Sequence, residues 1–401
     1  MDPDLLALPF YEPHHVALTQ RIDAWCQAHA ALWQAPDDPE RTGRDILRAL
    51  ADDGWLAFLD PDAGPAAVAD GDFRSVCLLR EALAYADDLA DYAFSIQALS
   101  ARPLLRYGSE EQRQRYLPQL AKGTFVGSFA VSEEEAGSDV AAVALRAERV
   151  AGGYVLDGHK AWVANGSIAD LHCVIARTGE GPGALGLTAF LVPATAPGVR
   201  VREKVPVIAP RAFANLAFDG CRLPDDSVLG RPGGGFVVAM DVLDRFRVTV
   251  GAAAVGFARR AMDAALARAR SRPMHGGRLF DLQTVQATFA DMEVKLNAAA
   301  LLVARAAWEI DRGNRHFARH SSIAKLYATE VAQEVVDASL QVFGAAGLVE
   351  DSVTERLYRQ VRSLRIYEGA SEVQKVIIAG SLARRSARPS QTAPSQTSRP
   401  S

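Results

Sequence analysis

The 401-residue chain has little cysteine, no long apolar run and no excess of positive charge. Its four cysteines, Cys26, Cys77, Cys173 and Cys221, lack the spacing of metal ligands or of a disulfide-rich scaffold, so we expect reduced, buried thiols. No run of about 20 apolar residues occurs, so no transmembrane helix is predicted. The net charge of -4 gives no support to nucleic-acid binding.

Other classes of protein are disfavoured by missing motifs. The eight histidines form no metal-ligand spacing, and the sequence therefore predicts no metal. No Gly-x-Gly-x-x-Gly motif follows a predicted strand, which disfavours a dinucleotide-binding βαβ unit. The acidic N-terminus resembles neither a secretory signal nor a basic transit peptide, and we predict a cytoplasmic location.

Three zones of different texture follow one another along the chain. Residues 1–123 carry apolar side chains at helical spacing, and residues 124–232 carry short strand-like segments separated by Gly and Pro. Residues 233–385 form long, proline-poor helical patterns, typical of an antiparallel bundle. Residues 386–401 are rich in Ser, Pro, Thr and Gln, and we predict a disordered tail.

The segment 366–374, Ile-Tyr-Glu-Gly-Ala-Ser-Glu-Val-Gln, carries the strongest chemical signal. Ser371 and Gln374 have the spacing of a capping box, so a helix is predicted to begin here with Glu368 on the loop before it. A helix N-terminus favours anions through its unpaired N–H groups. Taken alone, a glutamate in this place is most often a solvated residue that complements the helix dipole.

Five sequence blocks, read in order, resemble the acyl-CoA dehydrogenase family. They are residues 107–123, 129–139, 160–166, 341–347 and 366–374. The resemblance implies a mainly helical fold with a central β domain: an N-terminal helical domain, a small antiparallel β-barrel domain and a C-terminal four-helix bundle. It also implies FAD as cofactor, no metal, and a homo-oligomer, either a dimer or a tetramer.

In that family the glutamate at the place of Glu368 is the catalytic base. The resemblance implies that Glu368 removes the α-proton of an acyl-CoA, while its own backbone N–H stabilises the developing enolate. The β-hydrogen would leave as hydride to flavin N5, giving a trans-2-enoyl thioester. The electrons would then pass to an electron-transfer flavoprotein.

Further site residues are carried over from these blocks and from other positions that match the family. Positions implied to bind the cofactor are Val131, Ser132, Trp162, Ala164, Arg272, Gln283, Gln341, Gly344, Ala345, Ala370 and Glu372. Positions implied to bind the substrate are Ser138, Arg247, Gln97, Arg102 and Gly369.

The chain departs from the family pattern at several of these positions. Ala164 and Ala370 stand where the family has Thr, which removes two hydroxyl groups expected near the flavin. His275 replaces an aromatic residue of a Phe-Gly pair. Glu134 and Glu135 extend an acidic run that would repel a pyrophosphate unless the side chains point outward.

The identity of the acyl group is left open by the sequence. Residues 207–211 depart from a family loop that can contact CoA, which leaves a carrier-protein thioester as an alternative substrate. Arg102 could pair with a carboxylated acyl group, although a surface arginine is the commoner role. A flavin oxidase or monooxygenase on the same fold, and a non-catalytic flavin- or nucleic-acid-binding protein, are further alternatives.

Overall fold

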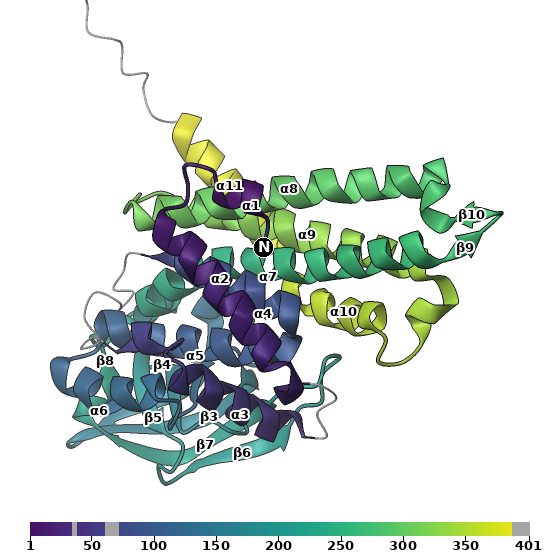
Figure 1. Ribbon diagram of the computed structural model, residues 1–401. Helices are drawn as coiled ribbons and strands as arrows, with labels where there is room; N and C mark the ends of the chain where they lie inside the picture. The colour runs from purple at the N-terminus through teal and green to yellow at the C-terminus, as the bar shows by residue number, and fades with distance from the viewer. Residues whose placement is uncertain (34–37, 61–71, 387–401) are drawn as a thin grey trace, which may run out of the picture.

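The computed structural model describes residues 1–33, 38–60 and 72–386. The described chain begins with a group of helices (Figure 1). These helices are α1 (Pro3–Leu6), α2 (Pro13–Ala28), α3 (Pro39–Asp52), α4 (Phe73–Ala86), α5 (Asp88–Tyr107) and α6 (Glu110–Ala121). Helices α3, α4 and α6 pack against α5, and α2 packs against α4. Ser109 and Gln112, within the block 107–123, form a capping box at the start of α6. The prediction that the N-terminal zone is helical is therefore confirmed.

A β-sheet domain follows in the middle of the chain. Its strands are β1 (Gly127–Ala130), β2 (Arg146–Val150), β3 (Gly153–Ala164), β4 (Leu171–Arg177), β5 (Leu187–Pro193), β6 (Val199–Lys204), β7 (Phe213–Pro224) and β8 (Val228–Leu229). They pair in the order β6-β7-β3-β2-β4-β5-β8, with β1 added beside β4. The expected β domain is confirmed, but this path is open, and β4 pairs in parallel with β1 and β2, so the sheet is mixed rather than an antiparallel barrel.

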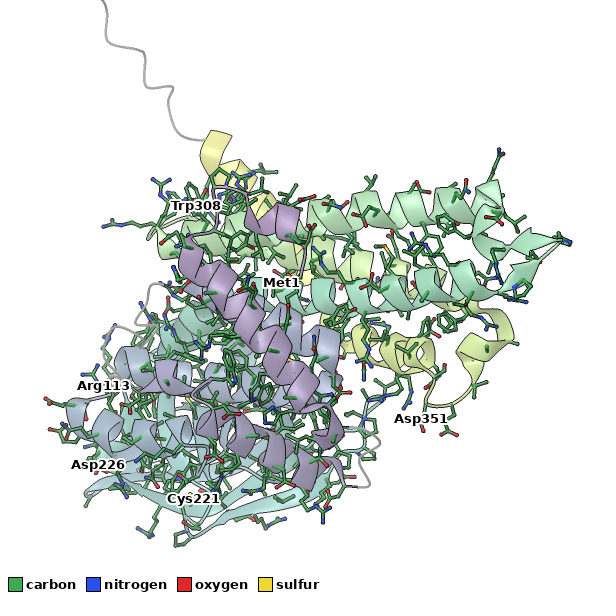
Figure 2. All side chains as sticks on the ribbon, viewed as in Figure 1. Met1, Arg113, Cys221, Asp226, Trp308 and Asp351 are labelled. Carbon is green, nitrogen blue, oxygen red and sulfur yellow. The ribbon has the colours of Figure 1, made fainter. Side chains whose placement is uncertain are left out.

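Three long helices dominate the C-terminal part, as their proline-poor patterns predicted. They are α7 (Gly235–Ser271), α8 (Gln283–Asp311) and α9 (Phe317–Phe343), and the short helix α10 (Val353–Arg362) and the last helix α11 (Ser371–Ser386) pack on α9. A two-stranded hairpin, β9 (Pro273–Met274) and β10 (Gly277–Arg278), joins α7 to α8. Side chains of α7, α8 and α9 fill the space between these helices (Figure 2).

The core of the bundle continues into the N-terminal helices, because α4 and α5 pack directly on α7. All four cysteines are buried and free of disulfides, as expected. Across the described ranges, no helix is long and apolar enough to cross a membrane. The cytoplasmic location stays a prediction, and the predicted disordered tail lies, from residue 387 onward, outside the described residues.

Candidate active site

A β-bulge in β3 turns Trp162 outward. The pairing of β3 with β7 shifts register between Lys160 and Val163, and Trp162 has a left-handed backbone with φ of 52°. Because a bulge inserts an extra residue, it re-aims the side chains beside it. The indole is therefore 50% exposed, while its backbone N–H donates to Asn215 Oδ1 at 2.9 Å. An exposed aromatic face of this kind suits a flat ring.

Lys160 connects the two sequence blocks that were predicted to bind flavin. Its fully buried Nζ donates to the carbonyl oxygen of Val131 and to Glu133 Oε1, both at 2.8 Å. The backbone N–H of Ala161 also donates to the carbonyl oxygen of Ser132 at 2.9 Å. Val131, Ser132 and Trp162 thus lie in neighbouring segments, as one binding surface requires.

The acidic run beside this surface fulfils the condition for binding a pyrophosphate, which is that Glu134 and Glu135 point outward. The Glu133 carboxylate folds inward, where the backbone N–H groups of Ala144 and Leu145 donate to it at 2.7 and 2.9 Å. Glu134 and Glu135 are exposed. Glu134 also forms an ion pair with Arg202 at 3.5 Å.

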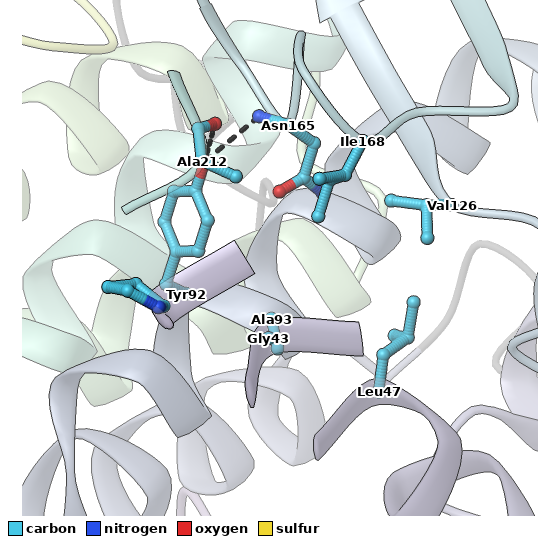
Figure 3. Close-up of a pocket in the computed structure, with 9 residues that line it drawn as sticks. Gly43, Leu47, Tyr92, Ala93, Val126, Asn165, Ile168 and Ala212 are labelled. Atoms are coloured by element: carbon cyan, nitrogen blue, oxygen red, sulfur yellow. Dashed lines mark hydrogen bonds between the residues drawn. The ribbon is translucent and has the colours of Figure 1, made fainter. Parts of the chain in front are cut away.

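Helix α5 fixes the end of the β3 motif through Tyr92. The Tyr92 hydroxyl donates to the carbonyl oxygen of Ala212 and accepts the backbone N–H of Asn165, both at 2.9 Å (Figure 3). The cavity beside these groups has a volume of about 10 Å³, which is room for about one water. It is a packing defect at the junction rather than a substrate site.

Glu368 lies on the loop before α11, as predicted. Its backbone is left-handed, with φ of 53°, a conformation that costs a non-glycine residue free energy and is concentrated at functional sites. Its Oε2 atom is buried and accepts no hydrogen bond from the described residues. Its backbone N–H likewise donates to no partner in the described part of the chain. A carboxylate oxygen and an N–H group are thus both available to a ligand.

Three buried side chains hold the carbonyl oxygens of this loop. Arg247 Nε donates to the Glu368 carbonyl at 3.2 Å, and Lys325 Nζ donates to the Gly369 carbonyl at 2.8 Å. The Gln374 amide donates to both carbonyls, at 3.3 and 2.8 Å. Arg247 and Gly369, predicted as substrate-binding, therefore belong to one constellation with Glu368.

The capping box predicted at Ser371 and Gln374 is wrong in its hydrogen bonds. Ser371 is the first residue of α11, and its hydroxyl donates to Glu330 Oε1 at 2.5 Å instead of accepting a backbone N–H. The Gln374 side chain reaches back to the carbonyl oxygens of Glu368 and Gly369. The pattern located the start of the helix correctly, but tertiary partners take both side chains.

Two opposing effects act on the pKa of Glu368. Burial raises it, and the charges of Arg80, Lys325 and Arg247, in that order, counteract part of the rise. Burial also lowers the pKa of the Lys325 ammonium to about 8, although Glu368 opposes this. A base with a raised pKa binds its proton more strongly, which suits a group that must remove a weakly acidic proton.

Arg80, Asp91 and Lys325 are functional candidates that the sequence reasoning missed. Arg80, on α4, donates from Nε and Nη2 to the two oxygens of Asp91, on α5, at 2.8 and 2.7 Å. Both side chains are almost fully buried. A signal was present for Arg80 and Asp91: each is a charged residue in a helix that is mostly buried, where an unpaired charge is too costly to survive.

A second group of predicted cofactor residues lies near the β9–β10 hairpin, at the end of the bundle far from the β domain (Figure 1). A Cβ atom added to Gly344 would lie 3.7 Å from Nη1 of Arg272, so these two predicted residues are neighbours. Gln341, Ala345 and Gln283 are exposed nearby in sequence. In Figure 1 the β9–β10 hairpin after Arg272 lies at the far right, whereas β3 lies in the domain at lower left.

The remaining predicted residues occupy varied environments. Gln97 is fully buried, and its amide group bonds to three backbone groups, those of Leu120, Phe125 and Gly127, so it acts as a structural link. Arg102 is buried with its guanidinium 5.1 Å from the ring centre of Phe73, which corrects the surface role. Ser138 and Glu372 are exposed, whereas Ser132, Ala164 and Ala370 are half-buried. The roles of these residues in binding stay predictions.

One cluster of possible metal ligands escaped the sequence reasoning. Ligand atoms of His14, His15 and Asp72 lie within 4.8 Å of one another. However, His15 Nδ1 accepts the backbone N–H of Glu12 at 2.9 Å, so a neutral ring carries its proton on Nε2, which donates to Asp72 Oδ1 at 3.0 Å. That hydrogen bond occupies the nitrogen that a metal would need, and the cluster joins α2 to the start of α4.

The comparisons with known proteins agree with this arrangement in every domain. Models of the acyl-CoA dehydrogenase N-terminal, middle and C-terminal domains match residues 12–124, 128–221 and 233–383. The chain belongs to the acyl-CoA dehydrogenase family. Members of this family are flavin-dependent oxidoreductases.

The alignments with individual family members cover most of the chain. The probable acyl-CoA dehydrogenase FadE25 of Mycobacterium tuberculosis is 35% identical over 384 residues, which cover 95% of this chain and 97% of FadE25. The human mitochondrial short-chain specific acyl-CoA dehydrogenase is 39% identical over 284 residues, 70% of this chain and 69% of the relative. The solved structure of butyryl-CoA dehydrogenase from Megasphaera elsdenii superimposes with a TM-score of 0.83 at 29% identity, covering 92% of this chain and 98% of that one.

Proposed function

We propose that this acyl-CoA dehydrogenase family member catalyses the FAD-dependent α,β-dehydrogenation of an acyl thioester to the trans-2-enoyl thioester. Glu368 is the base that removes the α-proton. The observation that carries the proposal is the buried Oε2 atom of Glu368, which has no hydrogen-bond partner among the described residues. A buried polar atom is nearly always paired in a protein, so an unpaired one marks a place for a ligand.

The loop geometry supports this role for Glu368. Arg247, Lys325 and Gln374 hold the backbone carbonyls of the loop, which leaves the carboxylate and the backbone N–H of Glu368 free for substrate. That N–H can donate to the thioester oxygen, where negative charge develops as the α-proton leaves. The base and the donor belong to one residue, so their separation is set by covalent geometry.

The residues of the β3 surface fit a flavin. Trp162 offers an exposed indole face, and Val131 and Ser132 lie in the segment that Lys160 holds next to it. Bound FAD would supply the two-electron acceptor for the β-hydrogen. Ala164 and Ala370 bring no hydroxyl to this surface, so its hydrogen bonds to a flavin must come from backbone groups and from Ser132.

The predicted cofactor residues form two groups that lie far apart in one chain, and this separation supports a homo-oligomer. Arg272 and Gly344 are neighbours, and Arg272 directly precedes the β9–β10 hairpin, which lies far from β3, the strand that carries Trp162 (Figure 1). We infer that Arg272 contacts the pyrophosphate of FAD in a neighbouring subunit, where its planar fork of donors suits a phosphate. An electron-transfer flavoprotein is the proposed electron acceptor, and a carrier-protein thioester is the alternative to acyl-CoA.

Anaerobic titration of the purified, flavin-loaded protein with a panel of acyl-CoAs tests the proposal. Loss of the visible absorbance of the oxidised flavin, with formation of an enoyl thioester by mass spectrometry, is expected for the wild type. The Glu368→Gln variant should bind the same thioesters without bleaching. If neither CoA nor carrier-protein thioesters reduce the flavin, the proposal is wrong, and oxygen consumption would then favour an oxidase.

A further inference from the structure

Glu330 of α9 contacts both ends of the Glu368 loop, which comprises residues 366–370. Its Oε1 atom accepts a hydrogen bond at 2.5 Å from the hydroxyl of Ser371, the first residue of α11. Its Oε2 atom forms an ion pair at 2.7 Å with Nη2 of Arg365, the residue directly before the loop. One carboxylate therefore joins the segment that enters the loop to the helix that follows it.

The Glu368 loop has a strained backbone at its centre. Glu368 and Gly369 follow one another with φ values of 53° and 88°, and a positive φ costs a glutamate free energy. Within the described part of the chain, the backbone N–H groups of residues 368–370 donate no hydrogen bond to another backbone group. The conformation of the loop therefore depends on side chains that hold it from neighbouring helices.

Those side chains act at two different places on the loop. Arg247, Lys325 and Gln374 bind carbonyl oxygens at its centre. Glu330 instead fixes the two ends. Fixing both ends of a loop of five residues restricts the conformations that its centre can reach. Lys325 and Glu330 both belong to α9, so one helix holds the centre of the loop and its ends.

Glu330 lies outside the core, so its effect on the loop can be separated from an effect on folding. The side chains of Glu330 and Arg365 are 31% and 33% exposed. Glu330 lines an open groove of about 460 Å³ between α8, α9 and α11. An ion pair this exposed contributes little to global stability, and water can solvate either partner when the other is removed.

The carboxyl group of Glu330 is ionised at neutral pH. Burial raises its pKa, but the hydrogen bonds from Ser371 and Arg365 outweigh burial and lower the pKa below the ordinary glutamate value. A carboxylate accepts hydrogen bonds through both oxygens, so it can hold a hydroxyl and a guanidinium at once. A neutral side chain of similar size cannot keep both contacts.

We propose that Glu330 is a positioning residue, which holds the two ends of the Glu368 loop so that the Glu368 carboxylate and N–H group are aimed at the thioester. This inference rests on the proposed function, because it takes Glu368 as the base. Glu330 acts through Arg365 and Ser371 rather than on the reacting atoms. Loss of either partner should therefore reproduce part of the effect of losing Glu330.

Stopped-flow reduction of the flavin tests this role in the Glu330→Met variant of the full chain. The probe is the acyl-CoA that reduces the wild-type flavin fastest, used at saturation. We expect the rate constant of flavin reduction to fall by roughly tenfold, since a shift of about 1 Å in a reacting group can cost a hundredfold. Arg365→Met and Ser371→Ala should each lower it less than Glu330→Met does.

A matched control comes from the next turn of the same helix. Glu334 lines the same groove and forms an ion pair with Lys295 at 2.7 Å, but it has no contact with the loop among the described residues. Glu334→Met should therefore keep the wild-type rate constant. A general effect of removing an exposed acidic group from α9 would instead slow both variants alike.

The amplitude of flavin bleaching separates positioning from a purely structural role. Partial unfolding lowers the amplitude, because fewer molecules react, but leaves the rate constant of the folded molecules unchanged. A displaced base lowers the rate constant at full amplitude. Deuterium at the α-carbon of the thioester should still slow the reduction in Glu330→Met, because proton removal is the affected step.

A double variant tests whether Glu330 acts through its partner. Arg365→Met should cause no further loss of rate in the Glu330→Met background, because the contact that it removes is already absent. Losses that multiply in the double variant would overturn the inference. So would a wild-type rate constant in Glu330→Met at full flavin content.

A milder variant keeps the inference testable if Glu330→Met does not fold. Glu330→Gln keeps an acceptor for Ser371 and loses the charge that holds Arg365, so its rate constant should fall severalfold. A wild-type rate constant in Glu330→Gln would then overturn the inference. Failure of the proposed function is seen separately, as a wild-type flavin that no thioester bleaches.

Discussion

Two residues that we propose to take part in cofactor binding and catalysis, Trp162 and Glu368, have left-handed backbones. Trp162 and Glu368 have φ values of 52° and 53°, in a region that bulky side chains rarely adopt. Each such residue costs roughly 1–3 kcal/mol, so the surrounding hydrogen bonds must hold it in place. The structure shows these bonds: Asn215 accepts from the Trp162 backbone, and Arg247, Lys325 and Gln374 hold the Glu368 loop.

The stability of the flavin-free protein should depend on pH through Glu368. Burial raises the folded-state pKa of Glu368 above its unfolded value of about 4.3, so the folded state holds the proton more strongly. Its stabilising contribution is therefore complete below about pH 4 and is lost as pH rises through the folded pKa. Glu368→Gln should leave the melting temperature unchanged at about pH 4 and raise it at neutral pH.

Thermal melts of both proteins across this pH range, by circular dichroism, check the expectation. The exposed Glu135, changed to Gln, is the control and should give a difference that is flat with pH. A neutral-pH melting temperature that falls in Glu368→Gln would contradict a raised pKa.

The same carboxyl group should set the acidic limb of the rate profile. Because the base acts only when ionised, kcat/KM should rise tenfold per pH unit below its pKa and level off above it. We expect the midpoint above the ordinary glutamate value of about 4.3. A midpoint at or below that value, measured with a well-bound thioester, would show that the nearby cations outweigh burial.

At the scale of elements, α9 and α11 act as the support of the catalytic loop. Lys325 of α9 is fully buried and ends on the Gly369 carbonyl, and Gln374 of α11 reaches back to the same oxygen. The loop is short, and its carbonyls are held by α9 and α11 together with Arg247 of α7. Its position therefore depends on how these helices pack.

Removing the ammonium group of Lys325 should weaken catalysis without removing a catalytic group. In Lys325→Met the Gly369 carbonyl loses a charged donor, and a shift of about 1 Å in the base can cost a hundredfold in rate. We expect kcat to fall by roughly tenfold to a hundredfold, while the flavin content is retained. Lys295→Met, which removes an exposed lysine of α8 paired with Glu334, is the control and should keep the wild-type kcat.

Elements were more predictable than the partners of their side chains. The three long helices follow from proline-free apolar periodicity, and the position of Glu368 before α11 follows from its motif. The hydrogen bonds of Ser371 and Gln374 could not be predicted, because Glu330 and the loop carbonyls come from distant parts of the chain. The pairing of Arg80 with Asp91 was missed for the same reason: a charge within a largely buried helix can be noticed in the sequence, but no local pattern identifies its partner on another helix.

At the scale of the whole molecule, one chain holds two separate groups of residues that we propose as cofactor contacts (Figure 1). Trp162 belongs to the β domain and Arg272 to the far end of the bundle (Figure 1). If each FAD contacts both surfaces, they must come from different copies. Assembly and flavin binding are then coupled, because a ligand that binds only the assembled form also stabilises it.

Subunit mixing tests this arrangement. Arg272→Ala should lose most of its flavin, and Glu368→Gln should lose its activity. When the two inactive proteins are unfolded and refolded together, activity should return, because an Arg272→Ala subunit keeps Glu368 and receives Arg272 from its neighbour. No recovery in hetero-oligomers confirmed by native mass spectrometry would place Arg272 at the flavin of its own subunit.

The unpaired oxygen of Glu368 also has a consequence for laboratory evolution. A library selected for heat resistance alone would enrich replacements of this residue. A neutral side chain removes the cost of burying a charge, and glycine removes the cost of a positive φ, so both stabilise the folded state. The most heat-resistant clones would then be inactive. Selection rounds therefore need to alternate heating with a screen for flavin bleaching, and loss of Glu368 among unscreened survivors would record how much the site opposes folding.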